Sequence, residues 1–148
     1  MGRKTEEKIN TIKVALLKWK SVGDKVSGEE TELKRALVGR DKIDQQYEKY
    51  FKSKGWDKKP NETEMKVDQA FQKLQKEEKQ AYADVSEAQK VLKGLHDDLK
   101  TSNTSVLKLL EDFEKFITEK DKKISDPNKK KSVPAAKAFI KEVYAALA

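Results

Sequence analysis

The fold is decided by residues 61–100, which read NETEMKVDQAFQKLQKEEKQAYADVSEAQKVLKGLHDDLK. Apolar side chains recur there at spacings that alternate between three and four residues. They are Val67, Phe71, Leu74, Ala81, Val85, Ala88, Leu92, Leu95 and Leu99. This alternation is typical of a coiled-coil seam, because it keeps a narrow apolar stripe facing a neighbouring helix. The stretch therefore predicts one long helix, and we call its apolar stripe the seam.

The length of this helix bears on the architecture. At 1.5 Å per residue, forty residues would span about 60 Å, which exceeds the width of a compact globule built from 148 residues. We therefore expect an all-α protein. The predicted form is an elongated antiparallel bundle of four to five helices around this central helix, in one domain over residues 1–148.

Four further helices are predicted, over residues 4–22, 28–53, 104–125 and 132–147. Gly23 and Gly28 interrupt the first apolar stripe, and Ser27 followed by Glu30 has the form of a capping box. An alternative is one bent helix through both segments, since a glycine weakens a helix by only about 1 kcal/mol.

Loops are predicted at two places beside the seam helix. Gly55 to Pro60 is the clearest loop, and Asn61 offers an N-cap directly after it. The polar cluster TSNTS at 101–105 favours a turn, because its side chains compete for backbone hydrogen bonds.

The charge is high and mostly carried by lysine. The net charge is +7, and only three of the 33 basic residues are arginine. Acids alternate with bases on nearly every helix, so we favour a solvated helical exterior over a diffuse attraction for anionic surfaces. Nucleic-acid binding is not expected, because arginine forks and basic-aromatic stacking patterns are missing. No apolar run approaches bilayer length and no apolar signal segment opens the chain, so we expect a soluble protein of undetermined compartment.

The sequence contains no candidate residues for catalysis, metal binding or cofactor binding. The chain has no cysteine, and His96 is its only histidine. Adjacent residues on a helix point about 100° apart, so His96, Asp97 and Asp98 cannot converge on a metal. Phosphate-binding loops, nucleophile elbows and zinc spacings are missing as well. We expect a non-enzyme without a cofactor.

Two places are candidates for contact with a partner or a lipid. Trp56 lies in the predicted loop and could be an exposed anchor, although we favour a lid folded over the end of the bundle. The lysine triplet 129–131 precedes an apolar helix, a form used on anionic membranes or in a partner's groove. We favour docking of that helix onto its own bundle. The candidate contacts there are Lys129, Lys130, Lys131, Phe139, Ile140, Val143 and Tyr144.

Glu78 occupies the one polar position of the seam. A polar residue in a seam lowers stability and can fix register or partner choice, but the seam could instead simply be exposed there. We weigh these two interpretations equally.

These observations favour a non-catalytic helical interaction module, a scaffold or adaptor that binds another protein through helix faces. The alternative is a lipid-binding module, which would either bind an anionic membrane surface or carry an apolar lipid inside the bundle. The oligomeric state is left open.

Overall fold

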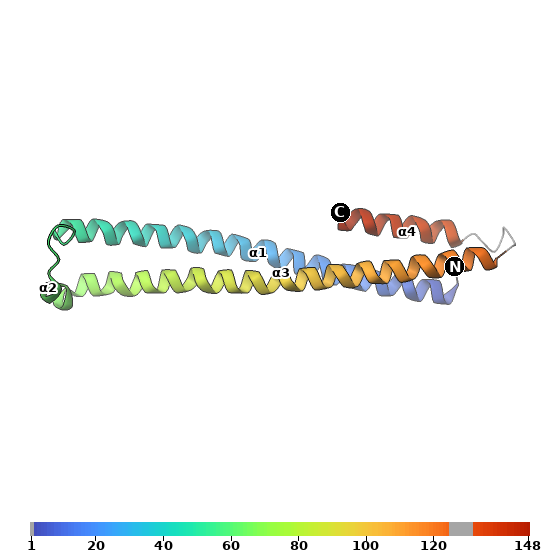
Figure 1. Cartoon of the computed structure of the whole chain (residues 1–148), viewed down its shortest axis with the longest axis horizontal. Coiled ribbons are helices and arrows are strands. Elements are labelled where there is room, and N and C mark those ends of the chain that lie inside the picture. Colours follow the sequence, from blue (N-terminus) through green and yellow to red (C-terminus); the bar gives the residue numbers. More distant parts are fainter. Residues whose placement is uncertain (1, 125–131) are drawn as a thin grey trace. The chain divides into compact units, whose positions relative to one another are not determined.

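The computed structural model describes residues 2–124 and 132–148. In that part of the chain four helices follow one another (Figure 1). They are α1 (Arg3–Ser53), α2 (Glu62–Val67), α3 (Gln69–Lys123) and α4 (Ser132–Leu147). The described residues contain no strand, and the predicted all-α class is confirmed.

The predicted boundary between helices 4–22 and 28–53 is wrong, because α1 continues through it. Gly23 and Val26 extend the four-and-three spacing of the preceding stripe, so the apolar face keeps its register past Gly23, and the helix itself continues through Gly28. The alternative of one helix through both segments is therefore the correct one.

The start of the predicted seam helix also differs. The chain leaves helical geometry at Asp68, whose φ of −80° and ψ of 104° are those of an extended residue, and this separates the six-residue α2 from α3. Val67 was expected on the seam but is 74% exposed, because the break takes it out of phase with the residues that follow. From Phe71 to Leu99, every predicted seam position is buried or half-buried.

The predicted turn at 101–105 is wrong. Thr101, Thr104 and Ser105 each donate a side-chain hydrogen bond to the carbonyl four residues earlier in α3, at 3.0–3.1 Å. The hydroxyls therefore bond inside the helix and do not compete with it. Ser102 takes the next position of the seam and is buried. The two predicted helices 61–100 and 104–125 thus merge in α3, which ends at Lys123.

The chain forms two compact units. Met1–Lys25 and Leu95–Ala148 make up the first, which we call the terminal unit, and Val26–Gly94 makes up the second, which we call the hairpin unit. Each contains part of α1 and part of α3, and only the terminal unit contains α4.

The terminal unit is a three-helix arrangement with a continuous apolar core. Lys120 of α3 donates a hydrogen bond to Thr5 of α1 at 3.0 Å, and Lys8 lies 4.9 Å from the ring centroid of Phe116, so the two helices run in opposite directions here. The buried apolar side chains of this core are Ile9, Ile12, Val106, Leu110, Phe113, Ile117, Val133, Ala136, Ile140 and Val143.

The hairpin unit is a pair of helices joined by a loop and the short α2. Tyr82 donates a hydrogen bond to Asp44 at 2.9 Å, and Tyr50 donates one to Asp68 at 2.6 Å, so α1 and α3 are antiparallel here too. Three seam residues of this unit, Leu74, Ala81 and Leu92, are only half-buried. Its fully buried apolar side chains are Val26, Trp56, Phe71, Val85 and Ala88.

Candidate functional site

At the loop end of the hairpin unit, where α1 connects to α2, a C-capping motif ends α1. Gly55 has a φ of 72°, and two hydrogen bonds close the last turn of α1: Gly55 N donates to Lys52 O at 3.0 Å, and Trp56 N donates to Phe51 O at 3.1 Å. This pair of bonds is a Schellman motif, in which glycine supplies the left-handed residue. The motif turns the chain so that Trp56 packs edge-on against Phe51, with ring centroids 5.8 Å apart.

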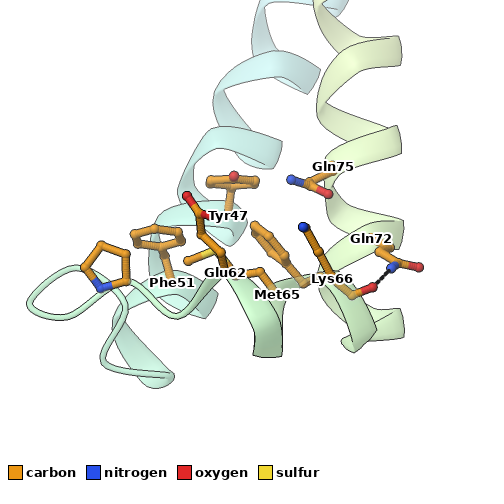
Figure 2. Close-up of a pocket in the computed structure, with 9 residues that line it drawn as sticks. Tyr47, Phe51, Glu62, Met65, Lys66, Gln72 and Gln75 are labelled. Atoms are coloured by element: carbon orange, nitrogen blue, oxygen red, sulfur yellow. Dashed lines mark hydrogen bonds between the residues drawn. The ribbon is translucent and has the colours of Figure 1, made fainter.

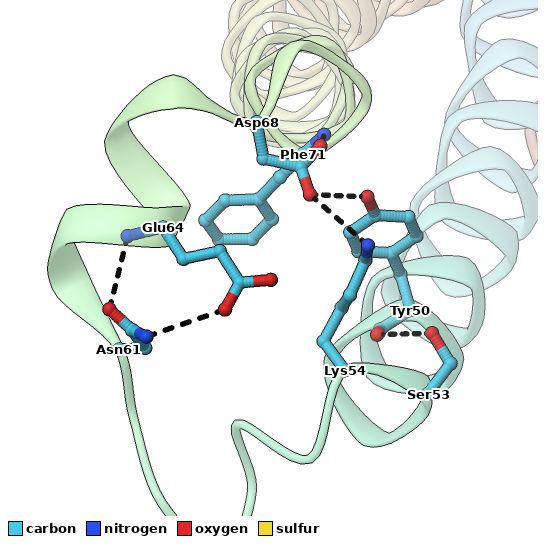
Figure 3. A network of polar contacts seen from close by, with 7 residues as sticks. All are labelled: Tyr50, Ser53, Lys54, Asn61, Glu64, Asp68 and Phe71. Atoms are coloured by element: carbon cyan, nitrogen blue, oxygen red, sulfur yellow. Dashed lines mark hydrogen bonds and ion pairs between the residues drawn. The ribbon is translucent and has the colours of Figure 1, made fainter.

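Two caps then restart the helix on the far side of the loop. Asn61 Oδ1 accepts a hydrogen bond from Glu64 N at 3.1 Å and caps α2, as the sequence predicts. Asp68 Oδ1 accepts a hydrogen bond from Phe71 N at 3.0 Å and caps α3 (Figure 3). The second cap is what fixes the break between α2 and α3.

Asp68 also joins α3 to the end of α1. Its Oδ2 accepts a hydrogen bond from the Tyr50 hydroxyl at 2.6 Å and lies 3.8 Å from Lys54 Nζ (Figure 3). The hydrogen bond from Tyr50, supported by that from Phe71 N, holds the pKa of Asp68 below its usual range. The same hydrogen bond raises the pKa of Tyr50 to about 12. This network anchors the two helix ends to one another.

Five aromatic side chains pack together at this end. Trp56 is 1% exposed and contacts Phe71, with ring centroids 5.0 Å apart, as well as Tyr50 and Phe51. Tyr47 completes the group at 5.4 Å from Phe71. Trp56 is therefore buried, which agrees with the lid that the sequence favoured and not with an exposed anchor; a contact between Trp56 and a partner stays a prediction.

An open groove of about 730 Å³ lies beside this aromatic group (Figure 2). Tyr47 and Phe51 of α1, Met65 of α2 and Phe71 of α3 form its apolar wall. The rest of its lining comes from Pro60, Glu62, Lys66, Gln72 and Gln75. Gln72 Nε2 donates to the carbonyl of Lys66, which ties the end of α2 to α3 beside the groove. The groove thus joins a fixed aromatic wall to a polar rim of one acid, one base and two amides.

Glu78, the predicted polar seam residue, is half-buried in the hairpin unit. Burial, and secondarily the negative charge of Asp44, raises the pKa of Glu78. Asp44 accepts the hydrogen bond of Tyr82, and the guanidinium of Arg40 lies 5.6 Å from the Tyr82 ring centroid. The seam therefore contains a partly hydrated polar section here, and whether it sets register or partner choice remains a prediction.

The candidate contacts in the last helix are largely turned into the protein. Ile140 and Val143 are buried in the core of the terminal unit, and Phe139 and Tyr144 are half-buried against it. This agrees with the favoured interpretation that α4 docks onto its own bundle. The other candidates, Lys129, Lys130 and Lys131, lie outside the described residues.

Histidine and carboxylate side chains do not converge within residues 2–124 and 132–148. No group of three or more histidine or carboxylate side chains in this range could hold a metal ion. His96 is exposed on α3. Over the same residues, no helix combines the length and the apolar character that crossing a bilayer requires.

The residues of the groove were missed by sequence reasoning, although signals for them exist. Gly55 followed by an apolar residue is the sequence form of a Schellman motif. Asp68, three residues before the apolar Phe71, has the type and position of an N-cap. Together these two signals would have placed the break before α3 and brought Tyr47, Phe51 and Phe71 to one end of the hairpin.

In comparisons with protein-family models, curated proteins and solved structures, nothing matches this chain.

Proposed function

We propose that this protein is a non-catalytic helical interaction module that binds an amphipathic helix of a partner protein in the groove beside Phe51 and Met65. One observation carries the proposal: the apolar wall of an open groove is formed by aromatic side chains that are already packed in place, with the buried Trp56 against Phe71. A wall fixed before binding reduces the entropy that a partner must overcome.

The composition of the groove supports a peptide occupant. Its volume of about 730 Å³ lies within the range of clefts that bury a drug-sized ligand, so it has room for several apolar side chains. Methionine adapts to differently shaped side chains, and tyrosine offers both an apolar face and a hydroxyl. The rim has one acid, Glu62, and one base, Lys66, which suits a partner of mixed polarity.

The half-buried seam supports binding through helix faces. Leu74 and Leu92 of the seam and Leu37 of α1 are half-buried, and Val38 and Tyr82 are 55% and 49% exposed. Apolar surface of this kind is what a helix-in-groove interaction covers. These side chains and the groove belong to the same hairpin unit.

A displayed library of amphipathic helical peptides, selected on the full chain, tests the proposal. Met65→Glu places a charge inside the groove, and Val67→Glu places the same charge on the exposed side of the same helix. Selected peptides should bind the Met65→Glu variant about tenfold or more weakly than the wild type, the loss of one buried apolar contact. The Val67→Glu variant should bind as the wild type does.

The proposal is overturned if no peptide is enriched, or if the enriched peptides bind both variants equally. Circular dichroism of the two variants shows whether each retains its helices. The elongated antiparallel bundle that the seam predicts, and the oligomeric state, are tested separately by measuring mass and hydrodynamic radius in solution.

A further inference from the structure

The positive charge of the chain is unevenly divided between the two units. The hairpin unit has 15 basic and 14 acidic residues, a net charge of +1. Six of the seven net positive charges therefore belong to the terminal unit.

Part of this positive charge lies around a second groove, of about 440 Å³, between the start of α1 and the end of α3. Four cationic side chains line it, against the single acid Glu119. These cations are Arg3, Lys4, Lys120 and Lys123. The rest of the lining is mostly apolar and includes Phe116 and Ile124.

The cations at this groove are available to an anionic ligand. Lys120 Nζ is part-buried and donates at 3.0 Å to the hydroxyl of Thr5, a neutral partner that leaves the ammonium charge uncompensated. Arg3 pairs with Glu7 at 3.3 Å, but both side chains are more than half exposed, so water and salt screen the pair. Lys8, just outside the groove, lies over the Phe116 ring and adds a further positive charge.

From this combination we propose that the groove binds an anionic phospholipid at a bilayer surface, independently of the function proposed for the hairpin unit. The phosphate lies among the ammonium groups of Lys4, Lys120 and Lys123, and the glycerol and first acyl carbons lie on Phe116 and Ile124. Point-charge lysines suit a mobile lipid phosphate. The backbone of a nucleic acid has no apolar chain that would cover Phe116 and Ile124.

Binding of the full chain to vesicles tests this inference. The groove variant is Lys4→Gln with Lys123→Gln, and the control variant is Lys18→Gln with Lys108→Gln. All four lysines are exposed and belong to the terminal unit. Both variants lose the same net charge. We expect co-sedimentation with phosphatidylglycerol-containing vesicles and little with phosphatidylcholine alone. Each lysine near an anionic bilayer is worth about a fivefold change in partitioning, so the groove variant should bind about 25-fold more weakly.

The control variant should retain most of the wild-type binding. Equal loss in both variants would mean diffuse attraction and would overturn the site, as would failure of the wild type to bind. A third variant, Ile124→Ser, tests the apolar floor and should weaken vesicle binding without changing the net charge.

Two competitors distinguish the lipid from other phosphates. Inorganic phosphate that releases the protein at equal ionic strength would show that the groove binds the free ion, and a short duplex DNA that competes through the groove lysines would show a nucleic-acid site. Either result overturns the lipid assignment.

Discussion

The terminal unit and the hairpin unit are built on the same helices, with the same four-and-three spacing of apolar residues, yet they bury those residues to different depths. In the terminal unit Val106, Leu110 and Phe113 are at most 1% exposed. In the hairpin unit Phe71, Val85 and Ala88 are buried, but Leu74 and Leu92 on the same seam are only half-buried. The difference is α4, which contributes four buried residues to the terminal core.

A seam pattern specifies contact between helices but does not specify how many helices share it. Two helices cover a seam from one side, and a third closes it. The hairpin unit compensates at its end, where five aromatic side chains and the Asp68 network hold the two helices together. Its seam can also include Glu78, with Arg40 of α1 half-buried nearby, because water still reaches both side chains.

The largest loss of stability is expected from Trp56 of the hairpin unit, and Trp19 of the terminal unit provides the comparison. Trp56→Ala should lower the free energy of unfolding by about 3–5 kcal/mol, since a fully buried ring leaves a cavity. Trp19→Ala should cost clearly less, because Trp19 is half-buried at the edge of the terminal core. Urea unfolding measures both values, and equal losses would contradict the assignment of Trp56 as the lid.

A second tryptophan variant separates packing from hydrogen bonding. Trp56 Nε1 is buried and has no hydrogen-bond partner among the described residues. Trp56→Phe retains an aromatic ring and removes that N–H, so its cost should be a small fraction of that of Trp56→Ala.

Leucines of the two units test the depth of burial directly. Leu110→Ala should cost about 2–5 kcal/mol, and Leu92→Ala about half as much, because the half-buried side chain loses fewer contacts. Amide hydrogen exchange would show where each loss falls. We expect faster exchange around Leu110 in the first variant and within Val26–Gly94 in the second. Equal costs would mean that the hairpin seam is covered in solution, for example by a second chain.

Two glycines should respond with opposite signs. Gly55→Ala should destabilise by about 1–2 kcal/mol, because its φ of 72° is unfavourable for any residue with a side chain. Gly28→Ala should stabilise by about 0.5–1 kcal/mol, since Gly28 lies on an exposed helical face. A Cβ at either position would meet no atom within 4 Å, so backbone conformation alone decides the sign. Thermal unfolding of the two variants measures it.

Much of the fold could be predicted from the sequence, because periodicity is written directly in the residues. The seam from Phe71 to Leu99 is buried or half-buried at every predicted position, and α4 has its predicted bounds. The errors lie where a local signal had two physical outcomes. The hydroxyls at 101–105 could end a helix or bond within it, and the intact seam through Ser102 favoured the second outcome.

The candidate site was less predictable, because it depends on contacts between residues far apart in the chain. Trp56 could be recognised as a lid or an anchor, but the residues that cover it lie on two helices that the loop brings together. They are Tyr50 and Phe51 of α1 and Phe71 of α3. The basic groove joins Lys4 to Lys123, and no local pattern relates these residues.

A smaller effect is expected from Asp68, whose charge links the two helix ends of the hairpin unit. Its pKa lies below the ordinary 3.8 in the folded protein, so its contribution to stability is present above pH 3.8 and is lost as the pH falls through the folded value. Asp68→Asn should lower stability at neutral pH, because asparagine can still cap α3 but carries no charge for Tyr50 and Lys54. The gap to the wild type should close in acid.

Glu78 should give the smallest effect, with the opposite sign. Burial raises its pKa above the ordinary 4.5, so the folded state binds the proton more tightly than the unfolded state, and stability falls as the pH rises from 4.5 through the folded value. Glu78→Gln should therefore be slightly more stable than the wild type at neutral pH, and the difference should vanish in acid. Urea unfolding across this pH range decides the matter. A variant less stable than the wild type at neutral pH would mean that the Glu78 carboxylate has a partner, and that the hairpin seam is polar here for a specific contact.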